Sequence, residues 1–88
     1  MLKLFVEGRV DTVTAKEFED AAKSDLDGVQ ELVLDLSKLD YISSAGLRVL
    51  LSLQKTMNKQ GSMKLTGVNE TVNDIFEVTG FSDILTIE

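Results

Sequence analysis

The chain has 88 residues, 15 acidic and nine basic, and a formal net charge of −6 at pH 7. It contains no histidine and no cysteine, which excludes disulfides, zinc–thiolate sites and histidine-activated nucleophiles. The negative charge disfavours nucleic acid and anionic membranes as partners, and no apolar run approaches the ~20 residues of a membrane span. The length predicts one domain over residues 1–88 with one modest core.

The first third of the chain predicts a strand followed by a helix. Apolar residues alternate with other residues over positions 2–7, which is typical of a strand, and Gly8-Arg9 ends the pattern. Thr14 and Glu17 have the spacing of a capping box, which predicts a helix start. Asp27-Gly28 ends this helix. Because the first residues of the chain already have the strand pattern, a cleavable N-terminal signal peptide is not expected.

The middle of the chain predicts a buried strand and a long helix. Positions 29–36 read as a strand, and the continuous apolar run at 32–34 is expected for a strand covered on both faces. The long helix is expected from about Ser44 to Gln60, with Gly61 as the residue that ends it.

The last third predicts two further strands around a short helix. A third strand is expected at 63–68, then a helix that Asn69 caps and that closes near Gly80, then a short strand or extended tail at 84–87. Strands that alternate with helices indicate an α/β domain with a mostly parallel, four-stranded sheet and three to four helices.

In such a sheet the carboxyl ends of the strands share one edge, where ligands and partners dock. Asp11 follows the first predicted strand, Ser43 and Ser44 follow the second, and Asn69 follows the third. We therefore expect these residues, distant in sequence, to lie near one another.

A serine at the start of a helix has three possible roles. It can cap the helix, act as a nucleophile, or accept a phosphate that the helix N-terminus favours. Catalysis is disfavoured because the chain has no histidine and no G-x-S-x-G elbow, and Arg48 does not give Ser44 an S-x-x-K partner. Composition and spacing leave capping and phosphate acceptance open, and they do not decide which serine caps.

The long helix has an apolar stripe and two further leucines beside it. The stripe consists of Gly46, Leu50, Leu53 and Met57 and is expected to face the sheet. Leu47 and Leu51 lie on a flank of the stripe. Either a neighbouring helix covers them, or they are surface residues suited to holding a partner.

These motifs resemble the STAS domain, in particular the small bacterial anti-sigma factor antagonists. The resemblance extends over nearly the whole chain and is strongest in the middle. It is carried by Gly8-Arg9-Val10-Asp11 with Thr14-Ala15, by Leu32 to Ser37 followed by Leu39 to Leu47, by Gly61, Lys64-Leu65 and Gly67-Val68, and by Val78-Thr79-Gly80-Phe81.

The chain departs from the family pattern at two points. Family members often begin with an additional strand that forms a hairpin with the next one. This chain starts directly at the strand before Gly8, so we expect the sheet to lack that edge strand. Many members have aspartate before the phosphorylated serine, where this chain has Ser43. Alignment on Gly46 places the phosphate acceptor at Ser44.

The resemblance implies a cytoplasmic partner-switching regulator that is neither an enzyme nor dependent on a cofactor or metal. The unphosphorylated form would bind an anti-sigma factor that is also a GHKL-type serine kinase, phosphorylation of Ser44 would release it, and a metal-dependent serine phosphatase would reset it. The alternative is a STAS module that binds constitutively in a transport, lipid-trafficking or scaffold complex. The expected partner-binding residues are Asp11, Ser43, Ala45, Gly46, Leu47, Arg48 and Leu51.

Overall fold

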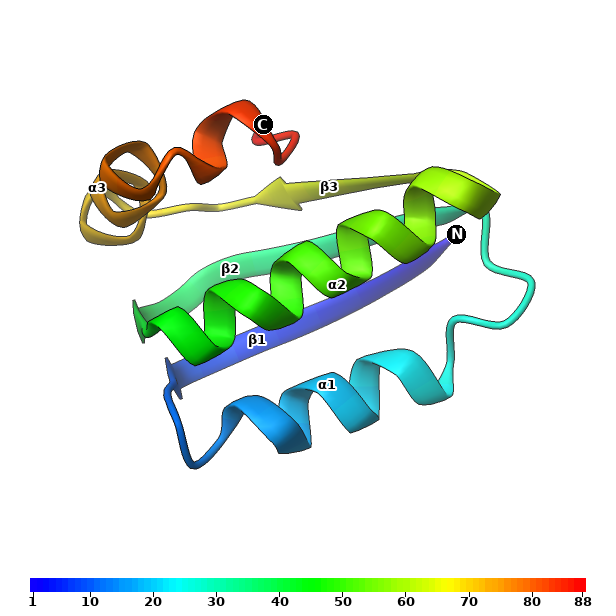
Figure 1. Ribbon diagram of the computed structural model, residues 1–88, viewed down its shortest axis with the longest axis horizontal. Helices are drawn as coiled ribbons and strands as arrows, with labels where there is room; N and C mark the ends of the chain where they lie inside the picture. Colours follow the sequence, from blue (N-terminus) through cyan, green and yellow to red (C-terminus); the bar gives the residue numbers. More distant parts are fainter.

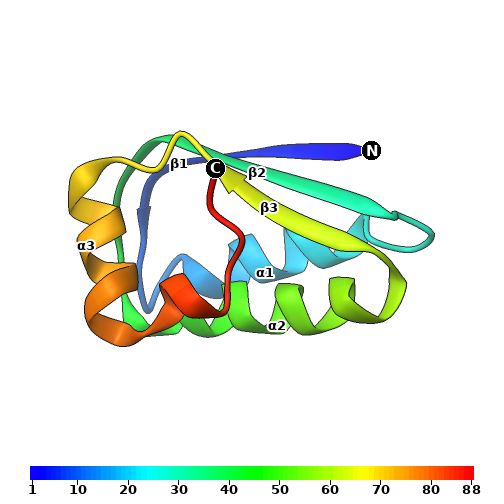
Figure 2. The same cartoon turned by 90° about the horizontal axis from the view of Figure 1, so that it is seen from above.

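The computed structural model describes residues 1–88, in which three parallel strands are covered on one face by two helices (Figures 1 and 2). The strand order is β1-β2-β3. A third helix lies at the end of the sheet toward which the strands point (Figure 1). No helix is both long and apolar enough to cross a membrane. The elements are β1 (Leu2–Val10), α1 (Ala15–Ser24), β2 (Glu31–Ile42), α2 (Ser44–Gln60), β3 (Ser62–Thr66), α3 (Glu70–Thr79) and the 3-10 turn η1 (Phe81–Asp83).

The C-terminal segment is an extended tail that meets β3 at one residue. The backbone N–H of Leu65 donates to the carbonyl of Thr86 at 2.9 Å, and the N–H of Glu88 donates to the carbonyl of Leu65 at 2.8 Å. These two bonds form one bridge, between Leu65 and Ile87. The sheet therefore has three strands and not the predicted four, because one bridge does not make positions 84–87 a strand. These positions form an extended tail, the second of the two expectations for them.

Strand β2 continues to Ile42, six residues beyond the predicted end at Leu36. Its pairing with β1 shifts twice, between Phe5 and Glu7 and between Gly8 and Arg9, and each shift inserts one additional residue into β2. Such bulges bend a strand. Figure 2 shows β2 curving out of the plane of the sheet toward the start of α2. The bend brings the residues before Ser43 from the sheet down to the helical layer.

One hydrophobic core lies between the sheet and the helices. It contains 20 buried residues from all three strands, all three helices and the loops that join them. Helix α2 contributes the predicted stripe, in which Leu50, Leu53 and Met57 are each at most 1% exposed. The core therefore fixes the orientation of α2, and with it the direction in which its first residues face.

Candidate functional site

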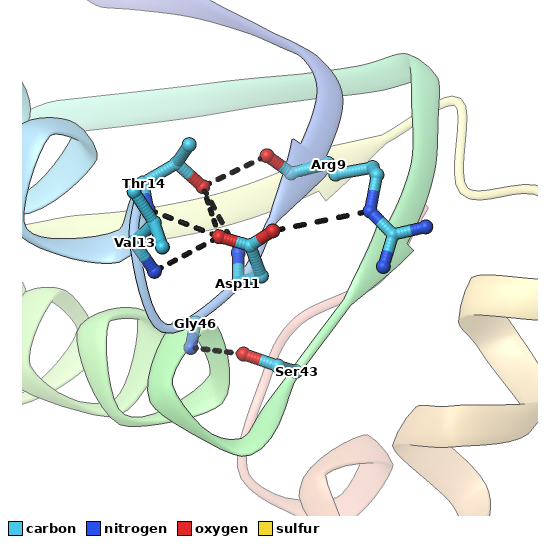
Figure 3. Close-up of polar contacts among 6 residues, drawn as sticks. All are labelled: Arg9, Asp11, Val13, Thr14, Ser43 and Gly46. Carbon is cyan, nitrogen blue, oxygen red and sulfur yellow. Dashed lines mark hydrogen bonds and ion pairs between the residues drawn. The ribbon is translucent and has the colours of Figure 1, made fainter.

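Asp11 organises the loop between β1 and α1. Its Oδ1 accepts hydrogen bonds from the backbone N–H of Val13 at 2.9 Å and of Thr14 at 3.1 Å. The Thr14 hydroxyl in turn accepts from the N–H of Asp11 at 2.9 Å and lies 3.0 Å from the carbonyl of Arg9 (Figure 3). Because the Thr14 side chain caps no N–H of α1, the predicted capping box with Glu17 is wrong. The side chain of Asp11 fixes the loop.

The hydrogen bonds from the backbone N–H groups of Thr14 and Val13 lower the pKa of Asp11. The group is thus ionised in the folded protein at pH values where an ordinary aspartate is partly protonated. Its ionised form stabilises the fold above the unfolded-state pKa, and this contribution is lost as the pH falls through the lower, folded-state pKa.

We expect an Asp11→Asn variant to lose part of the acid sensitivity of the fold. The free energy of unfolding of the unchanged protein falls as the pH drops below about 4, and the variant follows a shallower curve. Hydrogen bonds from Ser37 also lower the pKa of Asp35. Asp35 therefore supplies a second contribution to the acid sensitivity, which remains in the variant. Urea unfolding at a series of pH values measures both curves. Parallel curves would show that Asp11 has the same pKa in both states.

Arg9 connects the loop to the end of β2. Its guanidinium lies 4.8 Å from the centre of the Tyr41 ring, and its Nε lies 3.9 Å from Oδ2 of Asp11. Arg9 pairs with Tyr41 in the sheet because the second bulge of β2 shifts the register by one residue. Sequence reasoning did not single out this pair. A register without bulges would have placed Arg9 opposite Leu39, so no sequence pattern indicated the contact.

Ser43 and Ser44 have different roles in the structure. Ser43 is the N-cap of α2, and its Oγ accepts from the N–H of Gly46 at 3.5 Å (Figure 3). Its own N–H donates to the carbonyl of Val10 at 2.8 Å, which joins the start of α2 to the end of β1. Ser44 is the first residue of α2, is exposed, and its hydroxyl has no hydrogen-bond partner within the chain. Capping is thus assigned to Ser43, which leaves the Ser44 hydroxyl unused by the fold.

Gly46 allows α2 to begin close to the strand ends. A Cβ at this position would lie 2.6 Å from Cγ1 of Ile42 and 2.7 Å from Cγ1 of Val10. Both neighbours are buried, β-branched residues, and neither can move without disturbing the core. The glycine lets both serines approach the end of β1.

We expect Gly46→Ala to destabilise the domain by up to about 2 kcal/mol. Overpacking of this kind costs ~1–3 kcal/mol, and the better helix propensity of alanine returns about 1 kcal/mol. Chemical denaturation measures the loss, with Ser52→Ala on the same helix as a control. A Gly46→Ala protein as stable as the unchanged one would show that Val10 and Ile42 adjust freely.

The predicted partner-binding residues of α2 divide into buried and accessible ones. Leu47 is 5% exposed and belongs to the core, so the expectation that its side chain holds a partner is wrong. Gly46 is also buried and acts through the close approach described above. Arg48 is exposed, whereas Ala45 and Leu51 are half-buried.

A shallow groove lies between the first turns of α1 and α2, next to Ser44. Arg48 and Lys16 line it from opposite helices. The remaining lining residues are Thr12, Ala15, Glu19, Ala45 and Val49. Asn69, which follows β3, caps α3 as predicted, and its Nδ2 donates to the carbonyl of Leu39 at 2.7 Å. Among histidine, cysteine, aspartate and glutamate, no three side chains gather as metal ligands would.

The family model of the STAS domain matches residues 1–88. The chain belongs to the STAS domain family. It is 38% identical over 89 residues to BtrV of Bordetella bronchiseptica, which is named as a candidate anti-sigma factor antagonist, and the match covers 99% of this chain and 77% of BtrV. It is 32% identical over 91 residues to the anti-sigma-B factor antagonist of Listeria monocytogenes, covering 99% and 78%.

The fold is also that of a solved anti-sigma factor antagonist. The unphosphorylated form of the anti-sigma factor antagonist SpoIIAA superposes with a TM-score of 0.81 at 14% identity, covering 99% of this chain and 80% of SpoIIAA. The resemblance seen in the motifs is confirmed, and so is the α/β class of the domain.

Proposed function

We propose that this STAS domain is an anti-sigma factor antagonist whose affinity for its partner is set by phosphorylation of Ser44. The observation that carries the proposal is the position of Ser44. It is an exposed serine, two residues before Gly46, at the first position of α2 in a chain of this family. The names of the relatives from Bordetella and Listeria support the same function.

The local chemistry favours a phosphate on this serine. The first N–H groups of a helix lack intrahelical acceptors and the dipole is positive there, so an anion is stabilised. In the transfer, the bond between the γ-phosphorus of ATP and its bridging oxygen breaks, and a bond to Oγ of Ser44 forms. The hydroxyl proton leaves and ADP is released. Because the chain has no glycine-rich phosphate-binding motif, we assign the catalytic groups to a partner kinase.

The partner in this proposal is an anti-sigma factor with the serine kinase activity of the GHKL type, and a serine phosphatase removes the phosphate. The protein itself acts as ligand and substrate in the cytoplasm. The resemblance to the antagonists supports this assignment. The surface offered to the partner combines Asp11, Ser43 and Ser44 with Ala45, Arg48 and Leu51 of α2.

Incubation with the cognate kinase and ATP is expected to add one phosphate, at Ser44. Peptide mapping by mass spectrometry locates it. Ser44→Ala abolishes the addition, whereas Ser43→Ala loses a cap worth ~1 kcal/mol and is still phosphorylated. A phosphate mapped to Ser43, Ser37 or Ser52 would contradict the assignment.

A further inference from the structure

The outer edge of β1 is open. Strand β1 is nine residues long and lies at the end of the sheet order, so only its inner edge pairs with β2. Phe5, near its centre, is 66% exposed. Within residues 1–88 no strand covers the outer backbone N–H and C=O groups of β1. An open edge of this length is a template for pairing with another extended chain.

A groove follows this edge. One wall is β1 from Phe5 to Val10, and the other is the face of α1 that carries Glu17, Phe18 and Ala21. Val6 and Val10 are buried and Phe18 is half-buried, so the floor is apolar. A groove between a strand edge and a helix has the shape that one added β-strand fills, with side chains on one face of the strand packed against the helix.

The charges along the groove favour a basic occupant. Arg9 is paired with Asp11, and Lys3, further along β1, is paired with Asp35. Glu7 and Glu17 line the groove and take part in no ion pair. An added strand therefore meets two carboxylates that form no ion pair, although Lys38 of β2 lies opposite Glu7 in the sheet, within a protein whose net charge is −6.

A second folded copy does not fit this groove as well as a single strand does. Figure 1 shows α1 beyond β1, on the side away from β2. Two copies that joined their β1 edges about a two-fold axis would carry their helices on the same face of a continuous sheet. The α1 helix of each would then meet the helices of the other. One isolated strand avoids this collision because α1 covers it.

We propose that the groove between β1 and α1 binds an extended, basic segment of a partner protein by β-strand addition. The segment pairs with the outer edge of β1. Small apolar side chains on one of its faces pack against Phe18 and Ala21, and a lysine or arginine on the other face lies beside Glu7. Ser44 is not among the residues that line the groove, so the inference does not depend on phosphorylation.

A synthetic peptide of about eight residues, the length of an ordinary strand, tests the proposal. The probe alternates valine with lysine and has blocked termini, and the control peptide has glutamate in place of lysine. Titration into ¹⁵N-labelled protein is expected to shift the amide signals of residues 2–10 and of α1. The glutamate peptide is expected to bind at least tenfold more weakly.

Two variants at exposed positions of α1 locate the contact. Ala21→Gln fills the groove and is expected to weaken binding of the lysine peptide at least tenfold. Ser24 does not line the groove, so Ser24→Gln is expected to leave binding unchanged. Melting curves check that both variants fold. The proposal is overturned if no shifts appear at 1 mM peptide, or if they centre on the acidic residues of α3. Sedimentation that shows a dimer dissociated by Ala21→Gln would overturn it too, by assigning the edge to a second copy.

Discussion

Replacement of Ser44 by aspartate is expected to lower the affinity for the anti-sigma partner at least tenfold. The variant places a carboxylate on the accessible start of α2, directly after Ser43, whose N–H donates to the carbonyl of Val10 just before the ionised Asp11. Arg48, one turn further along α2, compensates part of this charge. A partner that covers the surface still has to desolvate it, and an incompletely paired charge at an interface typically costs ~2–5 kcal/mol. A phosphate with about two charges acts in the same direction and more strongly. Isothermal titration of both forms measures the loss.

The fold itself is expected to tolerate the change. Ser44 is exposed and makes no hydrogen bond through its side chain, and an acid suits the first turn of a helix. We therefore expect Ser44→Asp to change the free energy of unfolding by at most about 1 kcal/mol, with nearly the same far-UV spectrum. Ser62→Asp is the matched control, because it adds the same charge at an exposed position at the start of β3, the opposite end of the sheet. It is expected to bind normally.

Titration at two salt concentrations, below and above about 0.15 M, separates the electrostatic part of the affinity loss from the steric part. Above ~0.15 M salt the Debye length falls below ~8 Å, so part of the penalty of Ser44→Asp is screened. The steric part of a phosphate is not screened. Equal affinity of the free and phosphorylated forms for every partner, at either salt concentration, would exclude the phosphoswitch. It would leave a STAS module that binds constitutively.

The helices after the second and third strands could be predicted closely from local chemistry. Helix α2 runs from Ser44 to Gln60 as expected, because Ser43 caps it, an apolar stripe faces the sheet and Gly61 ends it. Helix α3 likewise has Asn69 as its N-cap and Gly80 in the left-handed conformation at its end. These signals lie within a few residues of the boundaries that they determine, so the sequence contains them in full.

The end of β2 and the loop at Asp11 depend on contacts that are distant in sequence. In β2 the buried residues Leu36, Leu39 and Ile42 recur every three positions because of the bulges, and this spacing resembles neither a regular strand nor a helix. The role of Asp11 depends on a loop conformation in which Thr14 bonds back to the strand. Tertiary structure selects both arrangements, so a pattern within one segment could not predict them.

Leu47 and Leu51 show the same division within one helix. Both lie off the apolar stripe of α2, and their spacing alone did not distinguish a covered position from a free one. In the structure Leu47 joins the core, whereas Leu51 stays half-exposed and is not among the residues packed against the core. Which of two equivalent leucines is covered depends on what surrounds α2 in the folded domain.

Leu47→Lys is therefore expected to destabilise the domain by several kcal/mol. The change removes a buried leucine, which alone costs ~2–5 kcal/mol. It also puts an ammonium group into a core in which no buried residue is charged. At this size the loss is a large part of the stability of an 88-residue domain. Melting temperature and urea midpoint are both expected to fall, or the protein will not fold.

The same substitution at Leu51 is the matched control and the test of the binding surface. Because Leu51 is half-exposed, the lysine stem can lie along the surface with its charge in water, so Leu51→Lys is expected to keep the fold largely intact. We expect it to weaken binding of the anti-sigma partner, since an apolar contact is lost on the face of α2 that carries Ser44, two turns further along the helix. Thermal melts and a binding titration on the same sample distinguish the two effects. A Leu51→Lys protein as destabilised as Leu47→Lys would remove Leu51 from the proposed surface, and a stable variant with unchanged affinity would move the partner contact away from this flank of α2.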